Sequence, residues 1–400
     1  MSCTFEFRTG AGFRSVAPAI AAVTVSLLLG ATPVKAATDP GRQRADVEAL
    51  ASDDMAGRDN GTAGSILAQA YLIDALKAMG AVGANSAASG DDAYRQPFTD
   101  GTNIVALLPG TDLSGEYVMV GAHYDHLGSA CLVPGLCNGA TDNAAGVANV
   151  LAIGRAIVAQ KKPVRRSVIL AFWDREEDGL LGSKHYADAP LVPLADTVAY
   201  VNYDIQGANL LPGLRKSTLA IGSESGDDAF RKAVKGASGG LKLAMLSAVF
   251  GQGRSDHVNF INRVPTVFFS DATSACYHTP QDDAGIVDYG KLARQAKGGV
   301  KLVLKLVNGV RPSLRPGQPL ATFDDAVLFR GLLKRAIPDV PTYFLPGDQA
   351  TLYDRYDKLT TLVKEGRPAF DDADVFPMLL WAYETTQILS RANTCSSFAD

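Results

Sequence analysis

Reactive side chains follow several short apolar runs in this sequence, and this recurrence limits the folds that the chain can adopt. Each run has the length of a buried strand. The runs are 117–122, 167–173, 198–203 and 264–269, and the side chains that come after them are His123, Glu176 with Glu177, Asp204 and His278. Helical stretches separate the runs, which predicts an α/β fold with a mostly parallel, twisted sheet flanked by helices. Ligands collect beyond the carboxyl ends of such strands, so we expect these side chains in one crevice.

Two aspartates extend this set. Asp125 lies two residues after His123, so both side chains can leave the strand end on the same side. A carboxylate there can hold one imidazole nitrogen while the other faces a metal. Asp142 precedes an apolar run, 144–160, that is long enough for a helix, and a helix N-terminus favours a carboxylate.

The composition predicts a folded protein without a nucleic-acid partner. A chain of 400 residues, 47% of them apolar, can form one large α/β domain or two smaller ones with a packed core. The net charge is only −4, and no basic run exceeds a pair such as Arg165 and Arg166, which argues against nucleic acid.

The two ends of the chain differ from its middle. Residues 1–36 combine early arginines, an apolar run and small residues, as in a secretory signal peptide, and the run is too short to span a bilayer comfortably. We therefore expect a periplasmic or secreted protein with no stable membrane span after cleavage. We expect the domain that holds the reactive side chains to span 37–311. From Pro312 a linker leads into three helix-like stretches, which predicts a C-terminal helical appendage over 312–400.

Export would leave four cysteines in an oxidising compartment. Cys131 and Cys137 flank a turn-like sequence, so a small disulfide loop is expected there. A bond between Cys276 and Cys395 follows only by elimination. A zinc site made of thiolates is disfavoured, because two close cysteine pairs are absent from the sequence.

The combination of imidazoles and carboxylates is typical of a zinc site. His123, Asp142, Glu177, Asp204 and His278 exceed the ligands that one catalytic zinc takes from a protein. Two metal ions that share a bridging carboxylate, about 3.5–4 Å apart, fit the set better. Adjacent acids project differently, so of Glu176 and Glu177 one can face a metal while the other acts as a general base.

The chain resembles the co-catalytic di-zinc aminopeptidase family, which includes aminopeptidase Y, leucyl aminopeptidases of bacteria and the related glutamate carboxypeptidases. The resemblance is carried by GAHYDHLG, GATDNAAGVA, FWDREEDGLLGSKHY, VNYDIQG, GRSDHVNF and YHTPQDD, in family order. It implies one zinc ion on His123 and Asp204, a second on Glu177 and His278, and Asp142 as the bridge.

The resemblance also implies roles around the metals. Glu176 matches the general base, Asp125 the partner of His123, and Tyr277 a donor to the developing oxyanion. A cis peptide bond between Asp142 and Asn143 is implied as well. The expected activity is hydrolysis of N-terminal residues from peptides with a free N-terminus, by attack of a zinc-bridged hydroxide.

Other functions remain open. The same metal site could serve a carboxypeptidase or dipeptidase, for which only Arg254 stands out as a group that could bind a substrate carboxylate. A metal-free interaction domain of the same fold is a further alternative, although every ligand position holds a competent residue. Carboxylate-rich sites also accept divalent metals other than zinc. We expect His126 to be structural, and Asp256 is a second candidate for the pocket lining.

Overall fold

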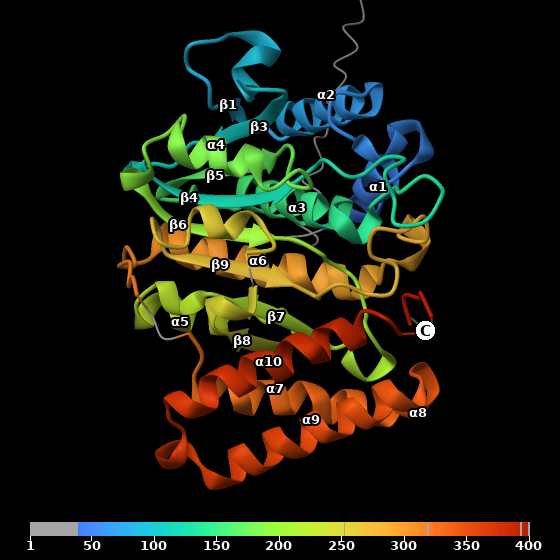
Figure 1. Cartoon of the computed structure of the whole chain (residues 1–400). Coiled ribbons are helices and arrows are strands. Elements are labelled where there is room, and N and C mark those ends of the chain that lie inside the picture. The colour runs from blue at the N-terminus through green and yellow to red at the C-terminus, as the bar shows by residue number, and fades with distance from the viewer. Residues whose placement is uncertain (1–38, 252, 318–319, 393, 399–400) are drawn as a thin grey trace, which may run out of the picture. The chain divides into compact units, whose positions relative to one another are not determined.

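A mixed sheet with helices on both faces forms the centre of the protein (Figure 1). The computed structural model describes residues 39–251, 253–317, 320–392 and 394–398, so the predicted signal peptide at 1–36 lies outside the described residues. The strands are β1 (Val82–Gly83), β2 (Arg95–Phe98), β3 (Gly101–Leu108), β4 (Leu113–His123), β5 (Arg166–Trp173), β6 (Thr197–Tyr203), β7 (Ser217–Ile221), β8 (Lys242–Leu246) and β9 (Thr266–Ser270). The α-helices are α1 (Pro40–Leu50), α2 (Ala63–Ala78), α3 (Ala145–Val158), α4 (Leu181–Asp188), α5 (Asp228–Lys235), α6 (Tyr289–Asn308), α7 (Phe323–Ala336), α8 (Val340–Tyr343), α9 (Pro346–Glu365) and α10 (Asp372–Leu389).

The central strands of the sheet are parallel. The strand order is β1-β3-β5-β4-β6-β9-β7-β8, with β2 paired to β3. Strands β5, β4, β6 and β9 run in one direction, whereas the pairs β3–β5 and β7–β9 are antiparallel. The predicted fold class of a helix-flanked α/β sheet is confirmed, with the parallel pairing concentrated at the centre.

Strand β5 shows why the apolar runs become central strands. All its residues are buried, and successive side chains point to opposite faces. Leu170 and Phe172 pack in the core that includes α3, while Ile169 and Trp173 pack on the other side with Phe260. A strand that is covered on both faces needs this unbroken apolar sequence.

The register of the central strands aligns their carboxyl ends. His123 at the end of β4 pairs with Trp173 at the end of β5, and Tyr203 at the end of β6 pairs with Phe269 in β9. The residues directly after these strands therefore leave the sheet at one edge.

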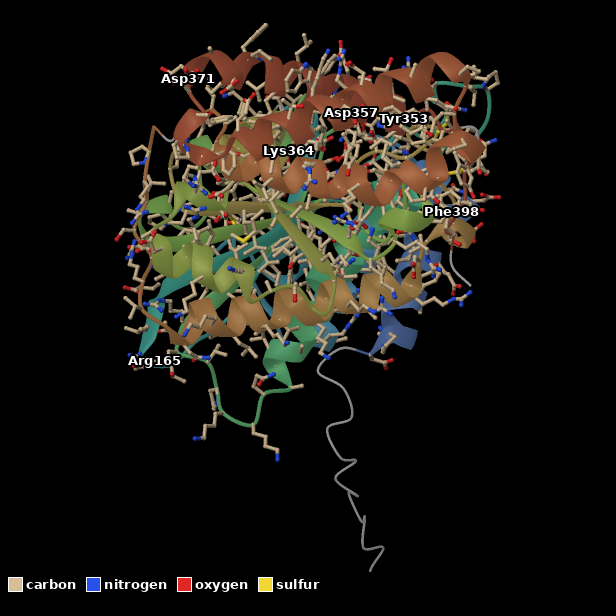
Figure 2. All side chains as sticks on the ribbon, turned by 90° about the horizontal axis from the view of Figure 1, so that it is seen from below. Arg165, Tyr353, Asp357, Lys364, Asp371 and Phe398 are labelled. Carbon is tan, nitrogen blue, oxygen red and sulfur yellow. A yellow bond between two sulfur atoms is a disulfide. The ribbon has the colours of Figure 1, made fainter. Side chains whose placement is uncertain are left out.

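The helices of the C-terminal segment form a separate apolar cluster beside β7 and β8 (Figure 1). Helix α7 is anchored by Asp325, whose carboxylate accepts hydrogen bonds from the backbone N–H and the hydroxyl of Ser247, at 2.8 and 2.7 Å. Helix α9 carries the exposed side chains of Tyr353, Asp357 and Lys364, which Figure 2 labels. The predicted appendage of helices is confirmed, whereas the domain boundary near residue 311 stays a prediction.

The structure contains two disulfides, one within a single loop and one between segments that are far apart in the sequence. Cys131 is bonded to Cys137 within the loop after β4, and Cys276 is bonded to Cys395 beyond α10. Both expected pairings are confirmed. The second bond joins the C-terminal segment to the loop that carries Tyr277 and His278.

Candidate metal centre

The predicted ligands lie at the carboxyl edge of the parallel strands. They are His123 at the end of β4, Asp142 in the turn before α3, Glu177 after β5, Asp204 after β6 and His278 in the loop after β9. The side chains of His123, Asp142 and Asp204 are almost completely buried, with 1–4% of these residues exposed. The structure thus brings together residues that are as far apart as 123 and 278 in the sequence.

Asp142 lies between the two imidazoles. Its Oδ1 is 3.3 Å from His123 Nε2, and its Oδ2 is 3.2 Å from His278 Nε2. His123 Nε2 is also 3.3 Å from Asp204 Oδ1, and His278 Nε2 is 3.1 Å from Glu177 Oε2. Two donor sets therefore share a single carboxylate, which has one oxygen in each set.

The donor atoms fit a metal better than they fit one another. His278 Nε2 is close to two carboxylates but is aligned with neither for a hydrogen bond, so it remains an unpaired buried nitrogen among the described residues. In the set of His123, Asp142 and Asp204, the donor atoms all lie within 4.8 Å of one another. Atoms that converge on a common point in this way match the requirements of zinc ligands.

The gathered carboxylates shift the pKa values of the imidazoles. Burial alone lowers the pKa of His123, but the charge of Asp204 and then of Glu176 raises it well above its ordinary value. Burial also lowers the pKa of His278, yet the adjacent carboxylates, Asp142 first, raise it to about 10. Burial raises the pKa of Glu176 well above its ordinary value, against the opposing effect of His123. The raised pKa values of the two imidazoles reflect an excess of buried negative charge, which a divalent cation would compensate.

Asp125 holds two parts of the site at once. Its Oδ1 accepts a hydrogen bond from the N–H of Glu176 and its Oδ2 one from the N–H of Glu177, at 3.1 and 3.2 Å. Its backbone oxygen is 3.2 Å and its Oδ1 is 3.5 Å from His123 Nδ1. Asp125 therefore orients the loop after β5 as well as the imidazole ring.

The turn that carries Asp142 depends on Asp282, which sequence reasoning missed. The peptide bond between Asp142 and Asn143 is cis, as expected. Asp282 Oδ1 accepts from the N–H and the hydroxyl of Thr141, each at 2.8 Å, and Oδ2 accepts from the N–H of Asp142 at 3.0 Å. Asp282 belongs to the YHTPQDD segment, but its partners are mostly backbone groups, which leave no pattern in a sequence.

Arg58 was also missed. Its guanidinium is completely buried and donates hydrogen bonds to the backbone oxygens of Tyr124, Leu50, Asn138 and Gly139. Burial lowers the pKa of Arg58 to about 10. Arg58 thereby connects the end of α1 to the segment after His123 and to the segment before Asp142.

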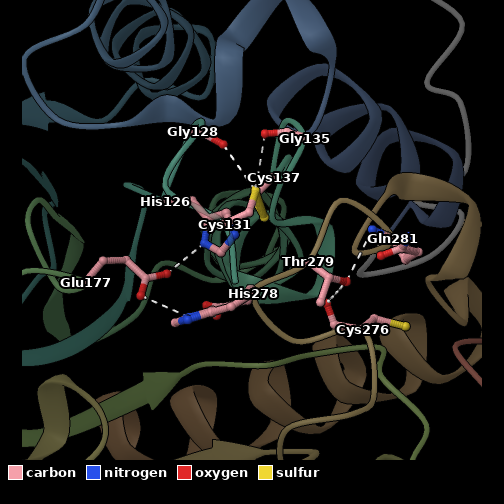
Figure 3. Close-up of a disulfide and its surroundings, with 11 residues drawn as sticks. His126, Gly128, Cys131, Gly135, Cys137, Glu177, Cys276, His278, Thr279 and Gln281 are labelled. Atoms are coloured by element: carbon pink, nitrogen blue, oxygen red, sulfur yellow. Dashed lines mark hydrogen bonds and ion pairs between the residues drawn. A yellow bond between two sulfur atoms is a disulfide. The ribbon is translucent and has the colours of Figure 1, made fainter. Parts of the chain in front are cut away.

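His126 contacts a candidate ligand directly. Its Nδ1 is 2.7 Å from Glu177 Oε1, while the other oxygen of Glu177 faces His278 (Figure 3). The Cys131–Cys137 disulfide lies in the same loop (Figure 3). We expect a structural role for His126, and its hydrogen bond to Glu177 could orient the carboxylate of that residue toward His278.

A cavity opens beside the cluster. Its lining includes Asp142, Glu176, Asp204, Tyr277 and Arg254. The Tyr277 ring stacks on the His278 ring, with centroids 3.7 Å apart. Of the two candidates for the pocket lining, Arg254 lies in the cavity, whereas Asp256 is fully buried and is not part of the lining.

Across the ranges that the structure describes, none of the helices combines the length and the apolar character needed to cross a membrane. This result concerns only those ranges.

Known relatives match a little under half of the chain. A vacuolar membrane protease from Verticillium alfalfae is 29% identical over an alignment of 216 positions, which covers 46% of this chain and 19% of that protein. Leupeptin-inactivating enzyme 1 from Streptomyces exfoliatus is 30% identical over 180 residues, which is 44% of this chain and 37% of that protein. The matched region therefore spans well under half the length of both relatives.

Solved structures with low sequence identity share the fold. The LapA aminopeptidase from Legionella pneumophila has a TM-score of 0.54 at 17% identity, over 68% of this chain and 71% of that chain. A glutaminyl cyclase from Porphyromonas gingivalis has a TM-score of 0.54 at 19% identity, over 68% of this chain and all of that chain (100%). Because enzymes with different names share this fold, the likeness supports the architecture alone.

The sequence profile described as Peptidase family M28 matches residues 103–303, which is half of the chain and includes every candidate ligand. The resemblance to co-catalytic zinc peptidases is thereby confirmed. The chain belongs to peptidase family M28.

Proposed function

We propose that the protein is an exported, zinc-dependent aminopeptidase that removes N-terminal residues from peptides. The observation that carries this proposal is the position of Asp142 between His123 and His278: its Oδ1 is 3.3 Å from the first imidazole and its Oδ2 is 3.2 Å from the second. A carboxylate with this placement suits the bridge between two ions. His123 and Asp204 would hold one zinc ion, and Glu177 and His278 the other.

The bound zinc ions would supply Lewis acidity to the scissile carbonyl and to water. Glu176 suits the task of a general base, because its carboxylate lines the cavity and its backbone is held by Asp125. It would accept a proton from the attacking water and deliver that proton to the nitrogen of the leaving amine. Among the described residues, no hydrogen bond or ion pair occupies the carboxylate of Glu176.

Tyr277 would donate a hydrogen bond from its hydroxyl to the oxygen of the scissile carbonyl as negative charge develops there. Two observations support this role: the residue lines the same cavity as Glu176, and its ring is fixed against His278. A donor that is already in place needs no reorganisation during the reaction.

The charges in the cavity favour recognition of a free amino group. Glu176 and Asp204 line it together and can attract an ammonium group. Arg254 lines the same cavity and favours a second candidate function, in which it binds a substrate carboxylate and the protein acts as a carboxypeptidase or dipeptidase.

Comparison of two chromogenic substrates and a peptide separates these activities. An aminopeptidase cleaves leucine p-nitroanilide and rejects N-acetyl-leucine p-nitroanilide. Cleavage of an N-acetylated peptide with a free C-terminus, without cleavage of the free anilide, would instead support a carboxypeptidase. A purified, folded protein that contains no divalent metal and cleaves none of the three would support the interaction domain.

Export and the domain division belong to the same proposal. The two disulfides suit an oxidising compartment. N-terminal sequencing of the mature protein tests the predicted cleavage after residue 36, and a protein that keeps Met1 would contradict it. The boundary between 37–311 and 312–400 can be tested by limited proteolysis near the linker.

A further inference from the structure

A second cavity lies between the sheet and the C-terminal helices. It encloses about 760 Å³ of space free of atoms, its open mouth included. Its apolar lining comes from both parts of the chain and includes Leu219, Phe250, Phe329, Leu333, Ala382 and Leu389. Helices α7 and α10 therefore form walls of this cavity, opposite β7.

This cavity adjoins the one beside the candidate metal ligands. Five residues line both: Leu219, Ile221, Phe250, Ala272 and Thr386. Of these, Thr386 belongs to α10. The C-terminal segment therefore contributes a residue to the cavity that Glu176 and Tyr277 also line. A substrate residue whose carbonyl lies near the ligands can extend its side chain through this junction.

The charges in the lining of the second cavity cancel. Lys291 Nζ is 3.0 Å from Asp271 Oδ1 and also donates hydrogen bonds to Ala208 O and Asn209 Oδ1. The carboxylate of Asp271 also accepts from Gln295. Both charged groups are thus fully occupied by the protein, so a charged ligand would enter the cavity without a partner.

One polar group of the second cavity is unpaired. The hydroxyl of Thr385 in α10 is buried and has no hydrogen-bond partner among the described residues. Buried hydroxyls that pack only against protein are normally paired. An unpaired hydroxyl in the wall of a cavity therefore points to a space that is filled by something other than the protein.

The C-terminal wall is fixed relative to the site. The disulfide between Cys276 and Cys395 attaches the segment after α10 to the residue before Tyr277. Asp325 attaches the start of α7 to Ser247, which comes directly after β8. A wall that is held at both ends can select a ligand by size.

We propose that this cavity is the subsite for the substrate side chain on the N-terminal side of the cleaved bond, and that the C-terminal helices form its outer wall. It selects large, uncharged apolar side chains such as those of leucine and phenylalanine. This inference rests on the proposed function. Since one methylene in an apolar pocket changes kcat/KM about 10- to 200-fold, we expect leucine over alanine by about 100-fold or more.

Ala382→Phe tests the wall, with Ala373→Phe as the matched control. Ala382 lines the cavity, whereas Ala373 is an exposed alanine of the same helix. kcat/KM is measured for the p-nitroanilides of alanine, leucine and phenylalanine. We expect Ala382→Phe to lower the leucine-to-alanine ratio of kcat/KM at least about 10-fold, and Ala373→Phe to leave it unchanged.

Thr386→Phe provides a second test, because this half-buried position at the junction tolerates a larger side chain more readily than a core position. It too should lower the ratio at least about 10-fold. If both variants fold, as judged by circular dichroism, and retain the wild-type ratio, the inference is wrong while the proposed function stands.

Loss of the proposed function gives a different result. A wild-type protein that cleaves none of the anilides contradicts the aminopeptidase proposal, and binding of free L-leucine and L-alanine then decides on the cavity. Thermal stabilisation of the wild type by L-leucine, absent in Thr386→Phe, supports the subsite. The same stabilisation in both proteins, or in neither, overturns it.

Discussion

The ligand cluster at the sheet edge and the cavity wall at the C-terminal helices are built from opposite kinds of side chain. The cluster consists of buried imidazoles and carboxylates, and Asp125 and Asp282 hold the backbone that carries Glu176 and Asp142. The wall consists of apolar side chains, and a few contacts hold its helices in place, among them those of Asp325 and Arg335 and one disulfide. An unpaired buried polar group costs about 1–3 kcal/mol, so the cluster tolerates few changes. An apolar wall tolerates substitutions that conserve volume, so the side chains that it accepts can change without loss of stability.

The largest effect should come from Glu176→Gln in the cluster. The amide retains the size of the side chain but cannot accept the proton, so kcat/KM should fall about 10²- to 10⁴-fold. Zinc content should stay at the wild-type level, because Glu176 is not among the proposed ligands. Steady-state kinetics and elemental analysis check both parts, and a variant with wild-type turnover would exclude the general-base role.

The two disulfides should differ in their effect on stability. The chain-entropy relation gives about 5 kcal/mol for Cys276–Cys395, whose residues are 119 apart, and about 2 kcal/mol for Cys131–Cys137, 6 apart. The Cys276→Ser/Cys395→Ser pair should therefore lower the free energy of unfolding more than the Cys131→Ser/Cys137→Ser pair. Urea unfolding measures both, and the reverse order would show that the long bond does not hold the C-terminal segment.

Replacement of Arg58 should destabilise the loops around the cluster. Arg58→Met leaves four buried backbone oxygens without their donor, so we expect a loss of about 3–5 kcal/mol in the free energy of unfolding. Arg44→Met is the control, since Arg44 is exposed on α1 and should change stability by less than about 0.5 kcal/mol. Equal losses in the two variants would contradict the proposed role of Arg58.

A smaller effect is expected at the carboxylate that positions the turn of Asp142. Asp282→Ala removes hydrogen bonds to Thr141 and Asp142 and should weaken zinc binding about 10- to 100-fold. The neighbouring Asp283 is exposed, and among the described residues its carboxylate accepts a hydrogen bond only from the N–H of Ala284, so Asp283→Ala should leave zinc affinity unchanged. Competition with a chelator measures both affinities. An unchanged affinity in Asp282→Ala would mean that the turn holds its shape unaided.

The sequence predicted the sheet centre and the position of the ligands for one physical reason. Central strands need unbroken apolar runs, and parallel strands bring the residues at their carboxyl ends to one edge of the sheet. His123 and Asp204 lie directly at the ends of such runs and could therefore be recognised. Strand β8 was missed because its residues are partly exposed, so its sequence has no continuous apolar character.

The remaining features depend on partners that leave no sequence pattern. Arg58 and Asp282 bind mostly backbone groups, which every residue carries. The contribution of α10 to the second cavity was equally hidden, because apolar residues at helical spacing indicate a helix without indicating what it packs against. Only the fold shows that Thr385 and Thr386 line this cavity.

Anomalous diffraction at the zinc edge, on crystals of active protein, tests whether the candidate ligands bind a pair of metal ions. We expect two peaks flanking Asp142, one within ligand distance of His123 and Asp204 and one within ligand distance of Glu177 and His278. Peaks elsewhere, or active crystals without any metal peak at this edge of the sheet, would contradict it.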